Sequence, residues 1–357
     1  MGHPAEERSR PPEFPGVALT TGDAAMKSAL CESLGIKIPI IQAPMGGADG
    51  PELAGAVSNA GGLGMLALWP YDVDIVRETI RATKALTDLP FGVNLNMQFP
   101  QDKRLDVCLE EKVQVISFFW GDPSNLIDRT HEGHAVVLHT CASAKEARKV
   151  VDDGVDIVVA QGWEAGGHVR GTVSTLPLIP AVVNAVSPTP VVAAGGIADG
   201  RGLAAAMALG ADGVWIGTRF LASYEAAVHP RYQKLLLGAT EDDTCHTQLF
   251  DIGWPNASHR VLRNKTVDIW EAAGRPPSGA RPGENEVIAK SRSRGDIVRY
   301  RSFTPANNVE GDIDALSLWS GQSVGIVADV KSVSEIMSDI VREAGEILKN
   351  ISSRFDD

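Results

Sequence analysis

The segment AQGWEAGGH, residues 160–168, is the part of the chain best suited to chemistry. It ends in a histidine that is preceded by two glycines. The segment follows a short apolar run, so His168 is expected in a loop after a strand. An imidazole in such a loop can donate a hydrogen bond or exchange a proton near neutral pH. Gln161 carries an amide that can pair with a flat heteroaromatic ring, and Glu164 can either orient His168 or be solvated. We predict that His168 is catalytic or contacts the substrate; the alternative is a structural hydrogen-bonding histidine.

Two further glycine-containing segments indicate an anion site. Gly195-Gly196 follows the run VVAA, and Gly217-Thr218 follows the next apolar run, GVWI. Glycine lets the backbone approach an anion and turn N–H groups toward it, and Thr218 adds a hydroxyl. A helix expected to begin near Asp199 adds the N–H groups of its first turn. We predict a phosphate site here; otherwise the two glycines mark only a tight turn from strand to helix.

The elements that position these segments are short apolar runs, each followed by Gly, Asn, Thr or Pro. Near-continuous runs of this kind are typical of parallel strands buried on both faces. The intervals between them indicate helices, such as SAKEARKVVDDG with its capping box and terminal glycine. Eight runs predict an α/β fold, a (β/α)8 TIM barrel, in preference to an open doubly wound sheet. The runs cover residues 38–42, 64–67, 91–94, 113–118, 136–139, 156–160, 191–194 and 213–216.

The eighth barrel helix is expected at the end of the chain. Apolar residues recur there at helical spacing behind Ser332 and Glu335, which suit a capping box. The Gly-, Pro- and Arg-rich stretch 274–302 is expected to be irregular and to lack a core. Four parts are predicted: an N-terminal tail (1–24), the barrel core (25–223), an excursion or lid region after strand eight (224–325) and a C-terminal helix closing the ring (326–357).

Charge and composition limit the classes of partner. The 357-residue chain has a formal net charge of −12, which makes nucleic acid and anionic membranes poor partners. Four scattered cysteines without a CxxC pair disfavour a disulfide framework, and the N-terminus lacks the apolar core of a secretory signal. His131 and His134 lack the spacing of a metal pair, so no metal site is predicted. We expect a cytoplasmic protein, with a homodimer as a possible state.

Together these motifs resemble the nitronate monooxygenase family, formerly called 2-nitropropane dioxygenases, which are flavin-dependent (β/α)8 enzymes. The ordered set QGWEAGGH, AAGGI and GTRF carries most of the resemblance, supported by PIIQAPMGG, GGLGMLA, FGVNL and LWSGQSVGIV. The resemblance implies FMN as the cofactor and His168 as the site histidine. It implies that Met45 lies close to the flavin and that three residues contact its ring and ribityl region: Asn94, Gln161 and Gly166. It implies that the phosphate end is held by Gly196, Trp215, Ile216, Gly217 and Thr218.

The resemblance implies oxidation of alkyl nitronates by dioxygen to carbonyl compounds and nitrite. His168 would then donate a hydrogen bond to the nitro group, or take the α-proton from a neutral nitroalkane. A sister group with a similar GGH loop, the flavin- and NAD(P)H-dependent enoyl-acyl carrier protein reductases, gives the alternative function. A barrel without enzymatic activity is a third hypothesis, disfavoured by the polar groups at the strand ends.

Overall fold

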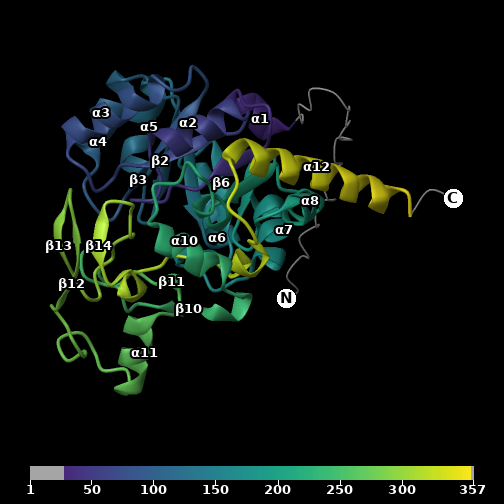
Figure 1. Ribbon diagram of the computed structural model, residues 1–357. Coiled ribbons are helices and arrows are strands. Elements are labelled where there is room, and N and C mark those ends of the chain that lie inside the picture. Colours follow the sequence, from purple (N-terminus) through teal and green to yellow (C-terminus); the bar gives the residue numbers. More distant parts are fainter. Residues whose placement is uncertain (1–27, 355–357) are drawn as a thin grey trace, which may run out of the picture.

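The computed structural model describes residues 28–354, and its centre is a barrel of eight parallel strands (Figure 1). The strands are hydrogen-bonded in the order β1-β9-β8-β6-β5-β4-β3-β2, and a bridge between Ile41 and Leu63 joins β1 to the start of β2. The predicted (β/α)8 barrel is confirmed, and each of the eight apolar runs forms one strand. The strands are β1 Ile40–Gln42, β2 Gly64–Ala67, β3 Phe91–Asn96, β4 Val115–Phe119, β5 Val136–Cys141, β6 Ile157–Gln161, β8 Val191–Ala194 and β9 Gly213–Ile216.

The barrel strands are buried on both faces, which explains why their sequences are apolar without alternation. One set of side chains, including Leu138 and Val159, forms a cluster inside the barrel. The alternate set, including Val137 and Val158, packs with residues of the surrounding helices. Helix α1, Ala29–Leu34, adds its apolar side chains to the interior cluster and so covers the N-terminal end of the barrel. The opposite end stays free for polar groups.

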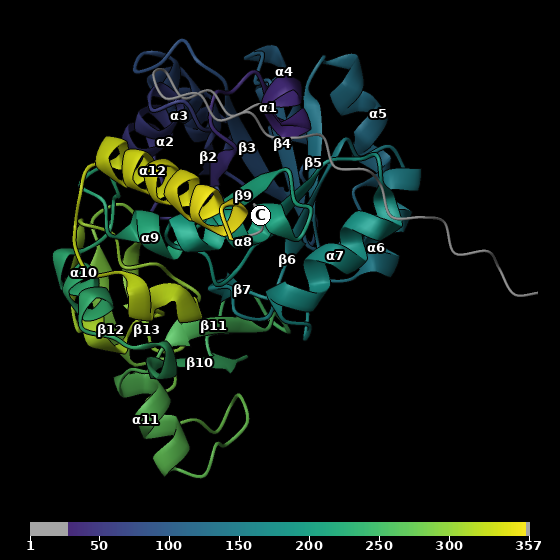
Figure 2. The ribbon, with the colours of Figure 1, turned by 90° about the vertical axis from the view of Figure 1, so that its right-hand side faces the viewer.

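Helices alternate with the strands and cover the outside of the barrel (Figure 2). Two of these helices, α6 and α8, begin at a residue whose side chain caps the first turn. The Ser143 side chain accepts the N–H of Glu146 at the start of α6, and Asp199 accepts the N–H groups of Arg201 and Gly202 at the start of α8. The helices between the strands are α2 Pro51–Asn59, α3 Val73–Lys84, α4 Asp102–Glu110, α5 Ser124–Glu132, α6 Ala144–Asp152, α7 Thr175–Val186 and α8 Gly200–Ala208.

The C-terminal helix takes the place of the eighth barrel helix, as predicted. Helix α12, Val333–Ser352, begins at a capping box in which Ser332 and Glu335 each accept the other's backbone N–H. Its apolar face, including Ile336 and Ile340, packs into the outer core and lies alongside α8 (Figures 1 and 2). The ring of helices is therefore closed by a segment more than 100 residues away from β9.

The residues between β9 and α12 cover the C-terminal end of the barrel. A two-residue strand β7, Gly167–His168, leaves the barrel after β6 and pairs with β11 of this excursion. The excursion therefore bonds directly to the predicted catalytic loop. Its elements are α9 Thr218–Leu221, α10 Pro230–Leu237, η1 Glu241–Asp243, β10 Thr244–Thr247, β11 His259–Leu262, α11 Lys265–Ala272, β12 Val287–Ser291, β13 Gly295–Val298, β14 Val309–Gly311, η2 Ile313–Ala315 and η3 Gln322–Ile326.

The expectation that 274–302 is irregular and coreless is wrong for its second half. Strands β12 and β13 form a hairpin that pairs with β14, visible as a small separate sheet in Figure 1. Ile297 and Tyr300 are each 1% exposed. Some of the arginines in this stretch are neutralised by partners in the fold: Arg281 pairs with Asp251 and lies 4.3 Å from the ring centre of Tyr300. Ion pairing thus lets a charged segment build a small core.

All four cysteines lie in the described part of the chain, and each is a free thiol. Among residues 28–354, no helix has the length and apolar character needed to cross a bilayer.

Candidate active site

A cavity of about 540 Å³ opens at the C-terminal ends of the barrel strands. Its wall includes all but one of the residues predicted to be catalytic or to bind the cofactor: Met45, Asn94, Gln161, Gly166, His168, Gly196, Trp215, Gly217 and Thr218. The exception is Ile216, whose side chain is fully buried in the outer core. Its backbone carbonyl accepts the N–H of Ala43 at 2.8 Å, so it fixes the loop after β1. The structure thus gathers residues from five strand ends around one space.

His168 lies in an aromatic box at this cavity. Its imidazole stacks on the ring of Trp254 with centroids 3.6 Å apart, and the ring of Trp319 lies 5.1 Å away. The backbone of His168 is fixed by pairing with His259 and by the amide of Gln161, which donates to the His168 carbonyl at 3.2 Å. The side chain is therefore held by rings and the main chain by the sheet.

The chemistry left to His168 is that of a neutral imidazole. Burial lowers the pKa of His168 well below its usual value, and the nearby His259 lowers it further. Its Nε2 atom is buried and has no hydrogen-bond partner among residues 28–354. A buried polar atom without a partner is costly unless a bound molecule supplies one. His168 is thus suited to hydrogen bonding with a ligand and poorly suited to act as a base.

Glu164 does not orient His168, contrary to one of the two expectations. Its carboxylate accepts the N–H of Thr175 at 2.9 Å and the hydroxyl of Thr175 at the same distance. Thr175 is the first residue of α7, where an acceptor satisfies free N–H groups and a negative charge complements the helix dipole. Glu164 therefore fixes the loop after β6 through α7.

Gly166, which the resemblance assigned to the ring and ribityl region, lies against a backbone segment that contacts Thr218 of the predicted phosphate end. A Cβ on Gly166 would overlap the backbone of Ser320 and Gly321, and a Cβ on Gly321 would lie 2.9 Å from the Gly166 nitrogen. This close approach requires glycine at both positions. The N–H of Gly321 donates to the Thr218 hydroxyl oxygen at 3.0 Å. The Thr218 hydroxyl can still donate its own hydrogen toward the cavity.

The donors at this end suit a phosphate. Gly196 has φ +74°, a left-handed conformation that glycine adopts without strain. The backbone N–H groups of Gly196 and Ser323 have no acceptor within residues 28–354. Both residues line the cavity beside the hydroxyl groups of Thr218 and Ser323. Backbone N–H groups without protein acceptors, together with hydroxyls, form an anion-binding nest, so these residues fit the phosphate of FMN.

The other end of the cavity suits a flat ring with amide-like edges. Asn94 is 4% exposed and donates to the carbonyl and hydroxyl oxygens of Ser117, both at 3.2 Å. Its own carbonyl oxygen makes no hydrogen bond with residues 28–354 and stays available as an acceptor. Met45 and Trp69 add apolar surface to the same wall. An isoalloxazine has both apolar faces and polar edges, and this wall matches both.

The loop after β1 is fixed by a buried carboxylate. Asp49 accepts the N–H of Met45 at 2.7 Å and that of Ala67 at 2.9 Å, joining the ends of β1 and β2. Burial raises the pKa of Asp49 to about 6, although both N–H bonds act in the opposite direction. On the other side of the loop, Thr304 donates to the carbonyl of Gly46 at 2.6 Å. Met45 is thus held between the barrel and the excursion.

The same combination of segments defines a known protein family. A family model described as nitronate monooxygenase matches residues 27–102 and 95–343. The chain belongs to the nitronate monooxygenase family. Membership supports an oxidoreductase on a TIM barrel, and FMN fits the cavity described above.

Individual relatives of the family carry different names. The chain is 37% identical, over 92% of its length and 99% of the relative, to a (3aS,4S,5R,7aS)-5-hydroxy-7a-methyl-1-oxo-octahydro-1H-indene-4-carboxyl-CoA dehydrogenase of Mycobacterium tuberculosis. It is 32% identical, over 88% of its length and 97% of the relative, to a probable nitronate monooxygenase of Staphylococcus saprophyticus. Among solved structures it matches FabK from Thermotoga maritima with 37% identity and a TM-score of 0.80, covering 92% and 99% of the two chains. The family is thus clear, whereas its members differ in substrate.

Several residues of the site were missed by the sequence argument. Trp254 and Thr304 lie in the excursion, and nothing in their local sequence separates them from ordinary core residues. Asp49 stands in a loop already singled out for Met45, but a lone aspartate there is equally typical of a turn. Gly321 lay within the family motif LWSGQSVGIV, which was the one available signal. Most of the residues that were missed belong to segments far in the sequence from the loops at the ends of the barrel strands.

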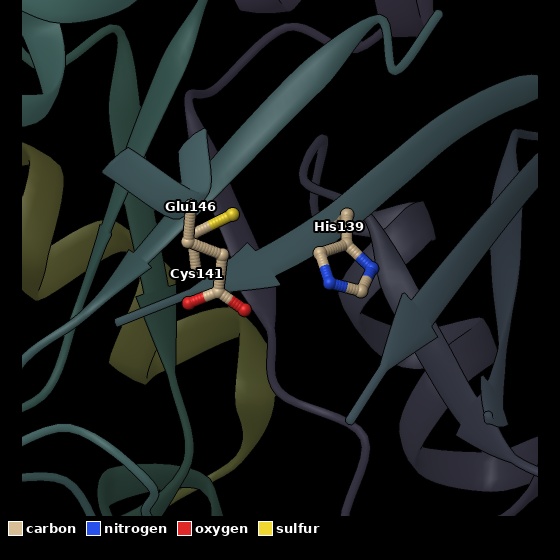
Figure 3. A group of neighbouring side chains, drawn as sticks. All are labelled: His139, Cys141 and Glu146. Carbon is tan, nitrogen blue, oxygen red and sulfur yellow. The ribbon is translucent and has the colours of Figure 1, made fainter. Parts of the chain in front are cut away.

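A group of potential metal ligands lies outside this cavity. His139, Cys141 and Glu146 have ligand atoms within 4.8 Å of one another, and Figure 3 shows them at the end of β5 and the start of α6. Burial lowers the pKa of His139 to about 4 and raises that of Cys141 to about 12. The Glu146 carboxylate already pairs with Arg170 and accepts the N–H of Ala142 at 2.8 Å. Glu146 is therefore already engaged within the protein, whereas both ring nitrogens of His139 are buried without a hydrogen-bond partner among residues 28–354.

Proposed function

We propose that this protein is an FMN-dependent oxidoreductase that oxidises alkyl nitronates with dioxygen, giving a carbonyl compound and nitrite. The observation that carries the proposal is the neutral His168 side chain, buried in an aromatic box at the cavity with its Nε2 atom unpartnered within residues 28–354. The family and its relatives named as nitronate monooxygenases support the same reaction class.

FMN, when bound, would supply the electron-transfer chemistry that protein side chains cannot. Its phosphate would be held by Gly196, Gly217, Thr218 and Ser323, and its ring by the wall that contains Met45, Asn94 and Gln161. These residues bind and orient; none of them carries a charge that titrates near neutral pH.

His168 would donate a hydrogen bond to a nitro oxygen of the substrate. A nitronate is already deprotonated at carbon, so it needs a donor and not a base. The rings of Trp254 and Trp319 exclude water from this hydrogen bond, which strengthens it in the low local dielectric. They also offer apolar surface for an alkyl chain.

The test measures nitrite release and oxygen uptake by the FMN-loaded protein with propyl-nitronate. We expect turnover that depends on bound flavin and falls when the His168 donor is removed. Absence of nitrite from protein with a full flavin spectrum would overturn the proposal.

A second candidate is oxidoreduction of an acyl-CoA thioester. It is favoured by the extent of the cavity, whose wall includes not only His168 but also Tyr71 and, at exposed positions of the β12–β13 hairpin, Ser293 and Arg294. A small nitronate leaves this outer part unused. The Mycobacterium tuberculosis relative, named as a CoA-thioester dehydrogenase, supports this candidate. Rapid NADPH oxidation with crotonyl-CoA, with little nitrite from propyl-nitronate, would favour it over the first.

A further inference from the structure

The outer mouth of the cavity is lined by a polar set that the proposed reaction does not use. The tip of the β12–β13 hairpin reaches the cavity, as do the segments that follow β13. Small hydroxyl and amide groups interact here: Asn308 donates to the Ser293 hydroxyl at 3.0 Å, and Ser293 lies 3.2 Å from the Ser291 hydroxyl. The polar residues of the mouth are Ser291, Ser293, Arg294, Arg301, Asn307 and Asn308.

Two arginines of this mouth lack a carboxylate partner. Neither Arg294 nor Arg301 makes a side-chain ion pair or hydrogen bond with any of residues 28–354, although acidic residues predominate in the chain. Other arginines of the same small sheet are paired: Arg292 with Glu310 at 3.0 Å and Arg299 with Glu286 at 2.8 Å. Two free positive charges therefore point to an anion supplied from outside the protein.

The placement of these arginines restricts the anion. The Arg294 guanidinium lies over the ring of Tyr71, 4.5 Å from its centre, which holds it at the rim of the cavity. Arg301 is half-buried in the same wall. A guanidinium binds phosphate through paired N–H groups, and neighbouring hydroxyls and amides suit the remaining phosphate oxygens. A ligand that spans from this rim to His168 must carry its phosphate well away from its reacting end.

We propose that Arg294 and Arg301 bind the phosphate groups of a nucleotide-type ligand whose reactive end enters the cavity toward His168. Two sources share this chemistry: a coenzyme A thioester and a nicotinamide dinucleotide. The site goes beyond nitronate oxidation, since an alkyl nitronate carries no distant phosphate. The arginine site is tested by measuring binding and not turnover. A negative result for this site can therefore be distinguished from a negative result for nitronate oxidation.

The experiment titrates the FMN-loaded protein with coenzyme A, NADPH and phosphate-free pantetheine, and follows heat of binding or flavin absorbance. We expect coenzyme A or NADPH to bind, and whichever binds identifies the source. Arg294→Gln and Arg301→Gln should each weaken that binding about 10-fold, as expected for loss of a charge-assisted contact. The affinity for pantetheine should change less than 2-fold in both variants, which is about the variation seen when a substitution does not affect the measured contact.

Arg292→Gln is the matched control, because Arg292 stands on the same hairpin but is already paired with Glu310. It should leave the affinity for the binding nucleotide within about 2-fold of the original. The proposal is overturned if neither nucleotide binds, or if Arg292→Gln weakens binding as much as the other two changes. Retention of the flavin spectrum in each variant shows that a loss is not due to unfolding.

Discussion

The two ends of the cavity are built in different ways. The end proposed to hold the phosphate is formed largely by backbone from the loops after β6, β8 and β9, with glycines at Gly166 and Gly196. The end that holds His168 is formed by side chains of the excursion, chiefly Trp254 and Trp319. The geometry of the first end depends on where the backbone can turn tightly and where two backbone segments can come close together. The geometry of the second end depends on which aromatic side chains of distant segments pack over the barrel.

We infer from this difference that the backbone end belongs to the scaffold that related proteins share, whereas the side-chain end is adapted to a particular substrate. Backbone donors at barrel strand ends recognise a phosphate whatever reaction follows. In the proposed function the excursion supplies walls around the substrate, so we expect changes there to alter specificity without loss of the fold. Relatives with the same barrel can therefore carry the names of different reactions.

Breaking the backbone contact at the phosphate end should have the largest effect. Gly166→Ala places a Cβ into the backbone of Ser320 and Gly321, so we expect loss of FMN loading by at least about 100-fold, measured by flavin titration of the apoprotein. Gly167→Ala is the control, because no atom lies within 4 Å of its Cβ position and only the left-handed φ of +69° opposes it. That change should cost about 1 kcal/mol and retain the flavin. Equal FMN loss in both variants would contradict the contact argument.

Removing the donor at the other end should leave flavin binding intact and reduce turnover. We expect His168→Ala to lower kcat/KM for propyl-nitronate about 10²–10³-fold, in the range found for a single donor at a reacting oxygen. Because the pKa of His168 is lowered by burial, we expect the neutral nitroalkane to lose activity by the same factor. A much larger loss with the nitroalkane would assign His168 the role of a base. Stopped-flow reduction with both substrates provides the comparison.

The end formed by side chains should also be the acid-sensitive one. His259 accepts the N–H of Phe250 at 3.2 Å through Nε2, and burial lowers its pKa to about 4. A histidine with a lowered folded-state pKa stabilises fully above about pH 6.5 and loses this contribution as the pH falls toward 4. We expect His259 alone to contribute a loss of roughly 2 kcal/mol in the free energy of unfolding from pH 7 to pH 5, with further losses from His139 and His168, whose pKa values are also lowered.

The effect of His259 can be isolated by substitution. His259→Gln keeps polar atoms but removes the titration, so urea unfolding at pH 7 and pH 5 should show a smaller difference than in the original protein. His139 and His168 titrate in both forms and cancel from the comparison. An unchanged pH difference would show that His259 does not contribute.

The smallest effect is expected from one hydroxyl at the phosphate end. Thr218→Val removes both the acceptor for the Gly321 N–H and a donor toward the phosphate, which should weaken FMN binding about 10-fold. Thr218→Ser retains the hydroxyl and should bind FMN within about 2-fold of the original. If both variants behave alike, Thr218 serves packing and not recognition.

Sequence reasoning succeeded where short-range rules apply. The eight barrel strands, the caps at Ser143 and Asp199 and the glycine loops all follow from residues within a few positions of one another. The family resemblance assigned Ile216 to the phosphate end together with its neighbours in the motif, but strand alternation turns its side chain outward. Sequence alone could not show that Trp254 would stack on His168, because the contact joins residues more than 80 positions apart.

The stretch 274–302 is a second case in which contacts between distant residues made the prediction from local sequence fail. Its composition is that of a loop, and the compensating charges lie outside it or at its own turns. Arg281 reaches Asp251, and Tyr300 donates to the carbonyl of Pro282 at 2.7 Å. From local composition a charged residue such as Arg281 is expected to be exposed, whereas in the fold it forms an ion pair with a residue from another segment.

The most direct test of the central claim is anaerobic mixing of the FMN-loaded protein with propyl-nitronate, followed by the flavin absorption bands. We expect the oxidised bands to bleach on mixing, and His168→Ala to show the same bound flavin but slower bleaching. Flavin bands that stay oxidised with propyl-nitronate but bleach rapidly with NADPH would contradict nitronate oxidation and favour the thioester reaction. Failure to bind FMN at all would contradict the assignment of the cavity itself.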